Sequence, residues 1–256
     1  MSPVRGSLIV AGFTIRHLLG RRRVFLLFLL SMVPAIFGIL ARTFAPPRAS
    51  TGFVQVTPEL FVAFLVPIIS LLMSSNVIRD AIDDRTVVFI LSTPVGRKAY
   101  AIGSMLGAFA VSAFALFVAA AGTWAGWRAG LAADVASDLS LLWGLLRVSL
   151  FGLILYVPFH SLLGAFLKFP TVIGIVAYGV LDLLFASLPG VLRKLGPSAY
   201  LEALLDPSFT TRNSLQQTAV DSFVAITQSE ARLAIPLVGA VFVLLFLTQM
   251  SRRDLI

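Results

Sequence analysis

Three aspartates lie close together in a polar stretch of the sequence: Asp80, Asp83 and Asp84. Carboxylates in such clusters can hold Mg²⁺, and membrane-embedded transferases use them to bind the pyrophosphate of a substrate. Because Mg²⁺ needs a near-octahedral shell, a second acidic group must face the first. On the side of the membrane where the topology below places these aspartates, the only other acidic residue is Asp254. A metal-dependent transferase therefore remains an alternative hypothesis, beside a solvated acidic turn.

Two oppositely charged residues, Arg147 and Asp182, fall inside apolar segments. Counted at 1.5 Å per residue from the predicted outer ends of their helices, they lie at depths of about 12 Å and about 9 Å. An unpaired charge at that depth is costly, so we expect the two side chains to pair or to share a polar cavity. The pair could be a static lock between two helices or a polar lining of a transport path.

Several other kinds of site are excluded or weakened. The chain has no cysteine, so disulfides, thiolate metal sites and a cysteine nucleophile are excluded. The two histidines, His17 and His160, are far apart in sequence, which makes a histidine metal site a weak hypothesis. No P-loop motif occurs, so this chain cannot itself use ATP through such a loop. We expect no catalytic residue, bound metal or cofactor in this chain.

The composition is that of a membrane protein. Of the 256 residues 58% are hydrophobic and only 12% are charged, about half the charged fraction of soluble domains. We expect an all-α membrane protein whose single transmembrane domain covers residues 1–256. Segments long enough to cross about 30 Å of hydrocarbon lie at about residues 24–41, 59–77, 100–123, 139–163, 171–188 and 233–250.

The basic residues set the orientation of these six predicted spans. Twelve of the 20 lie in segments predicted to be inside, seven lie outside and Arg147 lies in a span. The excess is strongest beside the first span, where Arg21, Arg22 and Arg23 stand. We therefore expect a multi-pass protein of the cytoplasmic membrane with both termini in the cytoplasm. Because the positive charge is placed beside apolar segments, we expect lipid and not nucleic acid as the partner of these residues.

Local patterns add four expectations. Residues 4–20 should form an interfacial helix whose apolar face contains Leu8, Ala11, Gly12, Ile15, Leu18 and Leu19. Pro67, inside the second span, frees a backbone carbonyl that neighbouring helices must bond. Gly103 and Gly107, four residues apart, are typical of close helix packing. The long outer segment 189–232 could dip back into the membrane or bind an external partner.

The connection between the second and third spans, residues 79–98, contains an apolar run at 87–91. An exposed run of that size needs a cover. We expect a short helix with Asp83 and Asp84 in its first turn and Thr93-Pro94 at its end. Such a helix, held between two spans, is suited to a groove in another protein.

This stretch resembles the cytoplasmic loop of type-2 ABC transporter permeases. The family reads acidic-x-acidic-x-Gly-Thr, an apolar run and then Leu-Leu-Ser-x-Pro-Val-x-Arg, and here Arg85 stands where the family has glycine. The resemblance implies a coupling helix that docks on a separate ATPase subunit. Its implied coupling residues are Asp80, Asp83, Asp84, Arg85, Thr86, Val87, Val88, Phe89, Ile90, Leu91, Pro94 and Arg97.

The resemblance further implies the permease subunit of an ABC exporter. Two copies, or one copy and a relative, would pair with two ATPase subunits that use ATP and Mg²⁺. The metal-dependent transferase and a membrane scaffold that transports nothing remain the alternatives.

Overall fold

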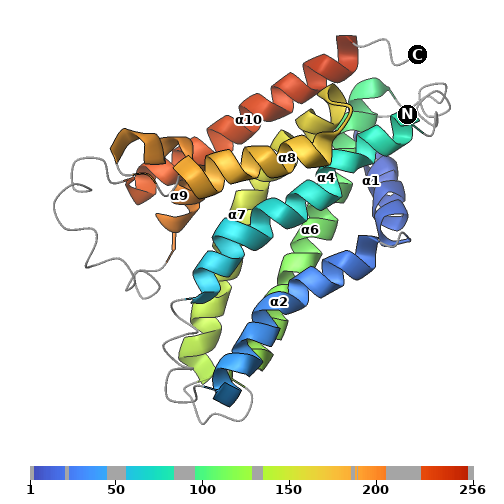
Figure 1. Cartoon of the computed structure of the whole chain (residues 1–256). Coiled ribbons are helices and arrows are strands. Elements are labelled where there is room, and N and C mark those ends of the chain that lie inside the picture. Colours follow the sequence, from blue (N-terminus) through green and yellow to red (C-terminus); the bar gives the residue numbers. More distant parts are fainter. Residues whose placement is uncertain are drawn as a thin grey trace.

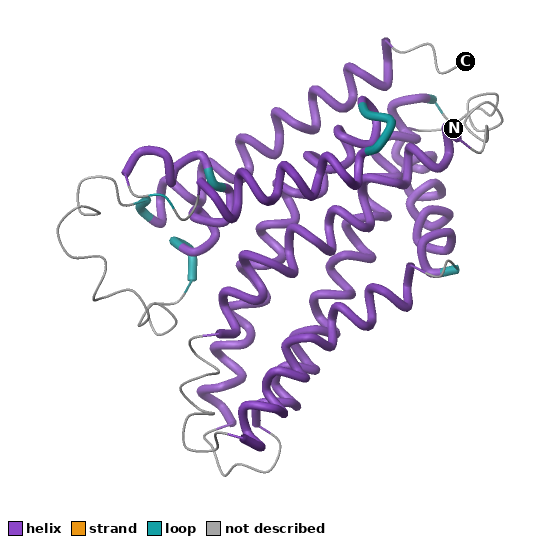
Figure 2. Tube along the Cα trace, viewed as in Figure 1, coloured by secondary structure: helices purple, strands orange, loops and turns teal. Residues whose placement is uncertain are grey.

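The described part of the chain is helical. A computed structural model describes residues 3–20, 23–44, 56–83, 96–128, 135–185, 188, 190–205 and 226–252. Within these ranges no strand occurs, and the helices form one elongated bundle (Figures 1 and 2). Its elements are α1 Pro3–Leu19, α2 Arg23–Phe44, η2 Glu59–Leu65, α4 Val66–Asp83, α6 Arg97–Arg128, α7 Val135–Phe166, α8 Pro170–Tyr178, η3 Gly179–Leu184, η5 Gly190–Leu195, α9 Pro197–Glu202 and α10 Gln228–Arg252.

Five helices are long and apolar enough to cross a membrane. They cover Val24–Phe44, Val56–Ala81, Arg97–Trp127, Leu139–Phe166 and Gln228–Ser251, so five of the six predicted spans are confirmed as apolar helices. The remaining prediction, a span at 171–188, corresponds to a shorter apolar helix, Pro170–Leu184. Its 15 residues reach only about 22 Å at 1.5 Å per residue, less than the hydrocarbon thickness.

The short helix reverses the direction of the chain after α7 (Figure 1). Figure 1 places the start of α1, the end of α4, the start of α6 and the ends of α7 and α10 at one end of the bundle. From that end α8 and η3 lead away beside α4, toward α9, and α10 leads back (Figure 1).

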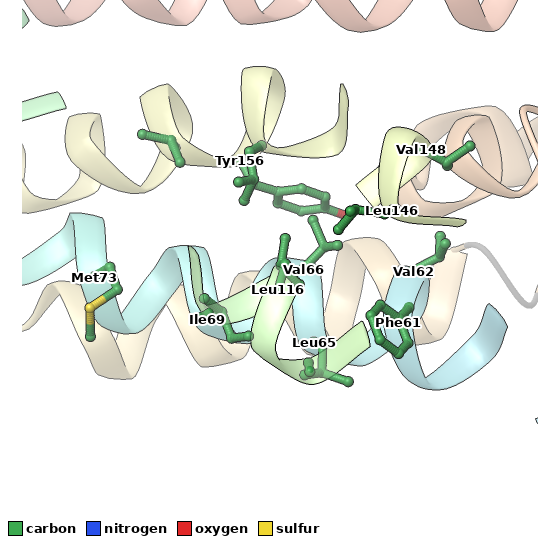
Figure 3. Close-up of a cluster of buried hydrophobic side chains, with 14 of the residues drawn as sticks. Phe61, Val62, Leu65, Val66, Ile69, Met73, Leu116, Leu146, Val148 and Tyr156 are labelled. Carbon is green, nitrogen blue, oxygen red and sulfur yellow. The ribbon is translucent and has the colours of Figure 1, made fainter. Parts of the chain in front are cut away.

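The η2–α4 helix is the centre of the bundle. In its most apolar stretch 72% of the residues are buried, compared with 28% in α2 and 22% in α10. Figure 3 shows Phe61, Val62, Leu65, Val66 and Ile69 along this helix, with Tyr156 of α7 lying across from them. The outer helices α2 and α10 therefore keep apolar surface for lipid or for another protein.

Helix α1 packs closely against α6 through the predicted glycines. A β-carbon built on Gly103 would lie 2.5 Å from the carbonyl oxygen of Ser7, and one on Gly107 would lie 2.7 Å from Cβ of Thr14. Close packing at Gly103 and Gly107 is thus confirmed, since no side chain larger than hydrogen fits there.

The predicted apolar face of α1 coincides only in part with the side that packs, where Ala11 and Leu18 are buried. Leu8 is 62% exposed and Leu19 is also exposed, whereas Val10 and Thr14 are buried against α6. The physical reason is that α1 is apolar on both sides, so periodicity alone could not identify the side that packs. The side that packs is the one that fits against Gly103 and Gly107 of α6.

Candidate functional site: a cavity within the helix bundle

A cavity of about 300 Å³ lies among the helices of the second half of the chain. Four parts of the fold line it: the middle of α7, the α8–η3 junction, the η5–α9 segment and the first half of α10. Most of the lining is aliphatic or aromatic, and it includes Tyr156, His160, Tyr178, Asp182 and Lys194. The candidate site is therefore an apolar cavity with a few polar groups, the usual character of a small-molecule site.

Pro67 explains why Tyr178 lies where it does. Proline has no N–H, so the carbonyl of Ala63, four residues earlier, lacks the donor that an α-helix would supply. The hydroxyl of Tyr178 donates a hydrogen bond of 2.7 Å to that carbonyl oxygen. The preceding turns are a π-helix, η2, in which the N–H of Val66 bonds the carbonyl of Phe61. The expectation that a neighbouring helix must bond the carbonyl freed by Pro67 is confirmed.

Asp182 is the central polar residue of the cavity. It is 5% exposed and lies in η3, the second π-helical segment, and such segments are frequent at functional sites. Its Oδ1 accepts a 2.6 Å hydrogen bond from the hydroxyl of Tyr156 and a 2.9 Å bond from the backbone N–H of Ser198. The first of these bonds lies at the short end of the usual range for a hydroxyl donor.

The bond from Ser198 also orders the outer wall of the cavity. Helix α9 begins at Pro197, and its N-cap residue Gly196 has no side chain to accept the free N–H groups of the first turn. Asp182 supplies that acceptor from η3. One carboxylate therefore links α7, η3 and α9 around the cavity.

His160 contributes a second polar connection, from α7 to α4. Its ring is 1% exposed, and its Nδ1 lies 3.0 Å from Oγ of Ser70. Ser70 donates its single hydroxyl hydrogen to the carbonyl of Pro67 at 2.9 Å, so its oxygen accepts the hydrogen bond from Nδ1–H of His160. The structure thus assigns the proton to Nδ1, and Nε2 is left as the acceptor of the neutral ring.

Aromatic rings pack around this histidine. The rings of Tyr156 and His160 are stacked with centroids 5.9 Å apart, and Phe159 lies 5.2 Å from both His160 and Phe242. These separations are typical of attractive aromatic pairs. The ring surfaces of α7 and α10 therefore form a continuous wall of the cavity.

Two ion pairs flank the cavity on the η5–α9 side. Arg193 contacts Glu202 at 3.0 Å, and Nζ of Lys194 lies 3.9 Å from Oε1 of Glu230. Burial raises the pKa of Glu202 above its ordinary value, and the Arg193 guanidinium offsets this only in part. Lys194, which lines the cavity, therefore has an acidic neighbour of its own.

The predicted pairing of Arg147 with Asp182 is wrong. Arg147 is exposed on α7, and the hydrogen bonds to Asp182 come from Tyr156 and Ser198. Arg147 precedes Tyr156 by nine residues, or about 13 Å along the helix. The error arose because depth was counted on two full-length helices, whereas the helix that carries Asp182 is short. Asp182 lines the cavity, but Arg147 is not among its lining residues, so the two side chains do not share it.

The predicted coupling stretch is described only at its two ends. Asp80 lies in the last turn of α4 and Arg97 begins α6. Asp83 is the final residue of α4, which corrects the expectation that it lies in the first turn of a new helix. The other predicted coupling residues fall at 84–95, outside the described residues. No group of three metal-binding side chains occurs in the described part of the chain, and Asp84 lies beyond it.

Sequence reasoning missed Tyr156, Tyr178, Ser198 and Ser70 as members of the site. The spacing of these residues could have indicated the site. Tyr156 precedes His160 by four residues and Tyr178 precedes Asp182 by four, so each pair shares a helix face. Polar residues recurring on one face of an apolar helix indicate a buried polar surface.

Comparison with known proteins adds no relative. No protein-family model matches the chain, and no curated protein matches it.

Proposed function

We propose that this chain is the membrane-spanning permease subunit of an ABC transporter, of the type-2 class. The single observation that carries the proposal is the resemblance of residues 83–97 to the coupling loop of that class. This stretch connects the end of α4 to the start of α6, two of the five apolar helices. A partner that binds there can push on both helices at once.

The membrane orientation is part of the proposal. The end of the bundle where α1 begins and α10 ends is assigned to the cytoplasm, because the basic residues gather there. The α8–η3 segment serves as the sixth crossing, short in itself and continued by η5 and α9. Both termini and the 84–95 connection then face the ATPase side, and the η5–α9 segment lies toward the outside.

The proposed mechanism is alternating access driven by another subunit. Two such chains, or one and a relative, form a dimer that binds two ATPases, and ATP with Mg²⁺ acts only in those subunits. Closure of the ATPases would move α4 and α6 together through residues 79–98. The cavity beside Asp182 lies in the outer half of this arrangement, where a substrate released from the cytoplasmic side would arrive. Export is the proposed direction.

The proposal is tested by capture of the ATPase. The full chain is purified from its native membrane, and a co-purifying P-loop ATPase is identified by mass spectrometry and by its ATP hydrolysis. Replacing Val88 and Phe89 by aspartate should abolish capture, since an apolar docking surface cannot bury two charges.

The chain contains a matched control for this test. Phe53 and Val54 are the same two residue types in the predicted outer loop, and replacing them by aspartate should leave capture intact. Capture that survives the Val88→Asp, Phe89→Asp change would refute the coupling function of this loop. Metal-dependent transferase activity of the chain alone would favour the aspartate-cluster alternative instead.

A further inference from the structure

Among the described residues, the Asp182 carboxylate in the cavity has no basic partner. Both hydrogen bonds described above go to Oδ1 of Asp182, from an uncharged hydroxyl and a backbone N–H. Among the lining residues that the structure describes, Lys194 is the only lysine or arginine, and it lies 3.9 Å from Glu230. A buried carboxyl with no adjacent positive charge is costly to ionise, and a cation bound beside it would stabilise the ionised form.

The surroundings of this carboxylate are aromatic. Tyr156, Phe159, Tyr178, Tyr200 and Phe242 all line the same cavity. The faces of such rings attract an ammonium group within about 6 Å, and the attraction grows when water is excluded. An inorganic cation would lose its hydration shell here and gain few oxygen ligands, so the lining favours an organic cation.

The third feature is the size and the wall of the cavity. Its volume of about 300 Å³ admits a small organic molecule. Apolar side chains of α7 and α10, including Leu155, Ile235 and Val238, complete the lining. An anion would meet the Asp182 carboxylate, and a strongly hydrated molecule would meet this apolar wall. Both are disfavoured by the same physical terms that favour a hydrophobic cation.

We propose that this cavity binds a hydrophobic monovalent cation, an amine or quaternary ammonium with an aromatic or alkyl body. The ammonium group lies at the Asp182 carboxylate between the tyrosine rings, and the apolar body contacts α7 and α10. That this cation is the transported substrate rests on the proposed function; its binding does not.

The test uses benzyltrimethylammonium, whose charge is permanent, as the probe. The full chain is placed in nanodiscs of zwitterionic lipid, and binding is measured by equilibrium dialysis with empty nanodiscs as the blank. We expect saturable binding that Asp182→Asn weakens at least tenfold. Asparagine keeps an oxygen that can accept the bonds from Tyr156 and Ser198, so the fold is retained. Glu59→Gln, which removes an exposed acidic charge outside the cavity, should leave binding unchanged.

A second variant and a second probe separate charge from shape. Ala234→Phe fills the α10 side of the cavity and keeps the Asp182 carboxylate, and it should also weaken binding at least tenfold. Neopentylbenzene, the uncharged isostere of the probe, should not displace it. Equal binding by wild type and Asp182→Asn, or displacement by the isostere, would overturn the proposal, as would unchanged binding by Ala234→Phe.

The outcome is distinguishable from that of the function proposed above. Dialysis contains no ATPase, so a chain that captures no ATPase can still bind the probe. Conversely, a chain that captures an ATPase and binds no cation would keep the permease function and lose this site.

Discussion

The hydrogen bond from Tyr156 to Asp182 should contribute measurably to stability, and Tyr156→Phe isolates it. The substitution removes only the hydroxyl oxygen and leaves the ring in the core shown in Figure 3. The lost bond is 2.6 Å long and ends on a carboxylate that is 5% exposed. After the change, the backbone N–H of Ser198 is the remaining donor to Oδ1.

The expected magnitude follows from two kinds of measurement on other proteins. Hydrogen bonds to charged groups contribute about 1.5–3 kcal/mol in soluble proteins. Bonds between membrane helices average about 0.6 kcal/mol and reach about 1.7 kcal/mol, because the unfolded chain also finds partners in the membrane. We therefore expect Tyr156→Phe to lower the free energy of unfolding by about 1–2 kcal/mol.

The assay is reversible unfolding in mixed micelles, read as a double-mutant cycle. Tyr156→Phe, Asp182→Asn and the double variant should show a coupling free energy of about 1 kcal/mol or more, since the two side chains are in direct contact. Tyr100→Phe is the matched control. Tyr100 is also buried, and it does not line the cavity, so Tyr100→Phe and Asp182→Asn should be additive within about 0.5 kcal/mol. Additive effects of Tyr156→Phe and Asp182→Asn would refute the claim that this hydrogen bond stabilises the fold around the cavity.

Three further predictions concern packing, the histidine connection and the acidic residue beside the cavity. Gly103→Ala should destabilise the chain because its β-carbon would lie 2.5 Å from a backbone oxygen of α1. Gly12→Ala, with open space around it, should stabilise α1 by up to about 1 kcal/mol; proteolysis of α1 compares them, and equal protection would contradict the packing. Ser70→Ala leaves Nδ1–H of the buried histidine without its acceptor and should cost about 1–3 kcal/mol of unfolding free energy. Ser75→Ala, whose hydroxyl bonds only its own helix at 2.7 Å, should cost less than half as much. Because burial raises the pKa of Glu202 above 4.5, the folded protein keeps a proton that the unfolded chain releases. Stability should therefore fall as pH rises from 4.5 through the folded-state pKa, and melting curves of Glu202→Gln should lack this slope.

Some properties of the protein follow from sequence because they depend on composition over a window. Transfer of a helix into hydrocarbon is close to a sum over its residues, so five apolar helices were predicted at about their observed positions. Because proline has no backbone N–H, Pro67 predicts that the Ala63 carbonyl bonds a donor from another helix, but it does not identify that donor. Gly103 and Gly107 likewise predicted a close neighbour without identifying it as α1.

Other properties depend on which surfaces meet, and these only the tertiary structure decided. Sequence placed a costly charge at Asp182, but several donors could have bonded it. The short α8–η3 helix brought Tyr156 and Ser198 to the carboxylate and left Arg147 exposed on α7. The side of α1 that packs against α6 could not be predicted either, because both faces of α1 are apolar. Composition determines that a group must be buried or bonded, and the fold determines by what, because partners far apart in sequence are brought together only by helix length and packing.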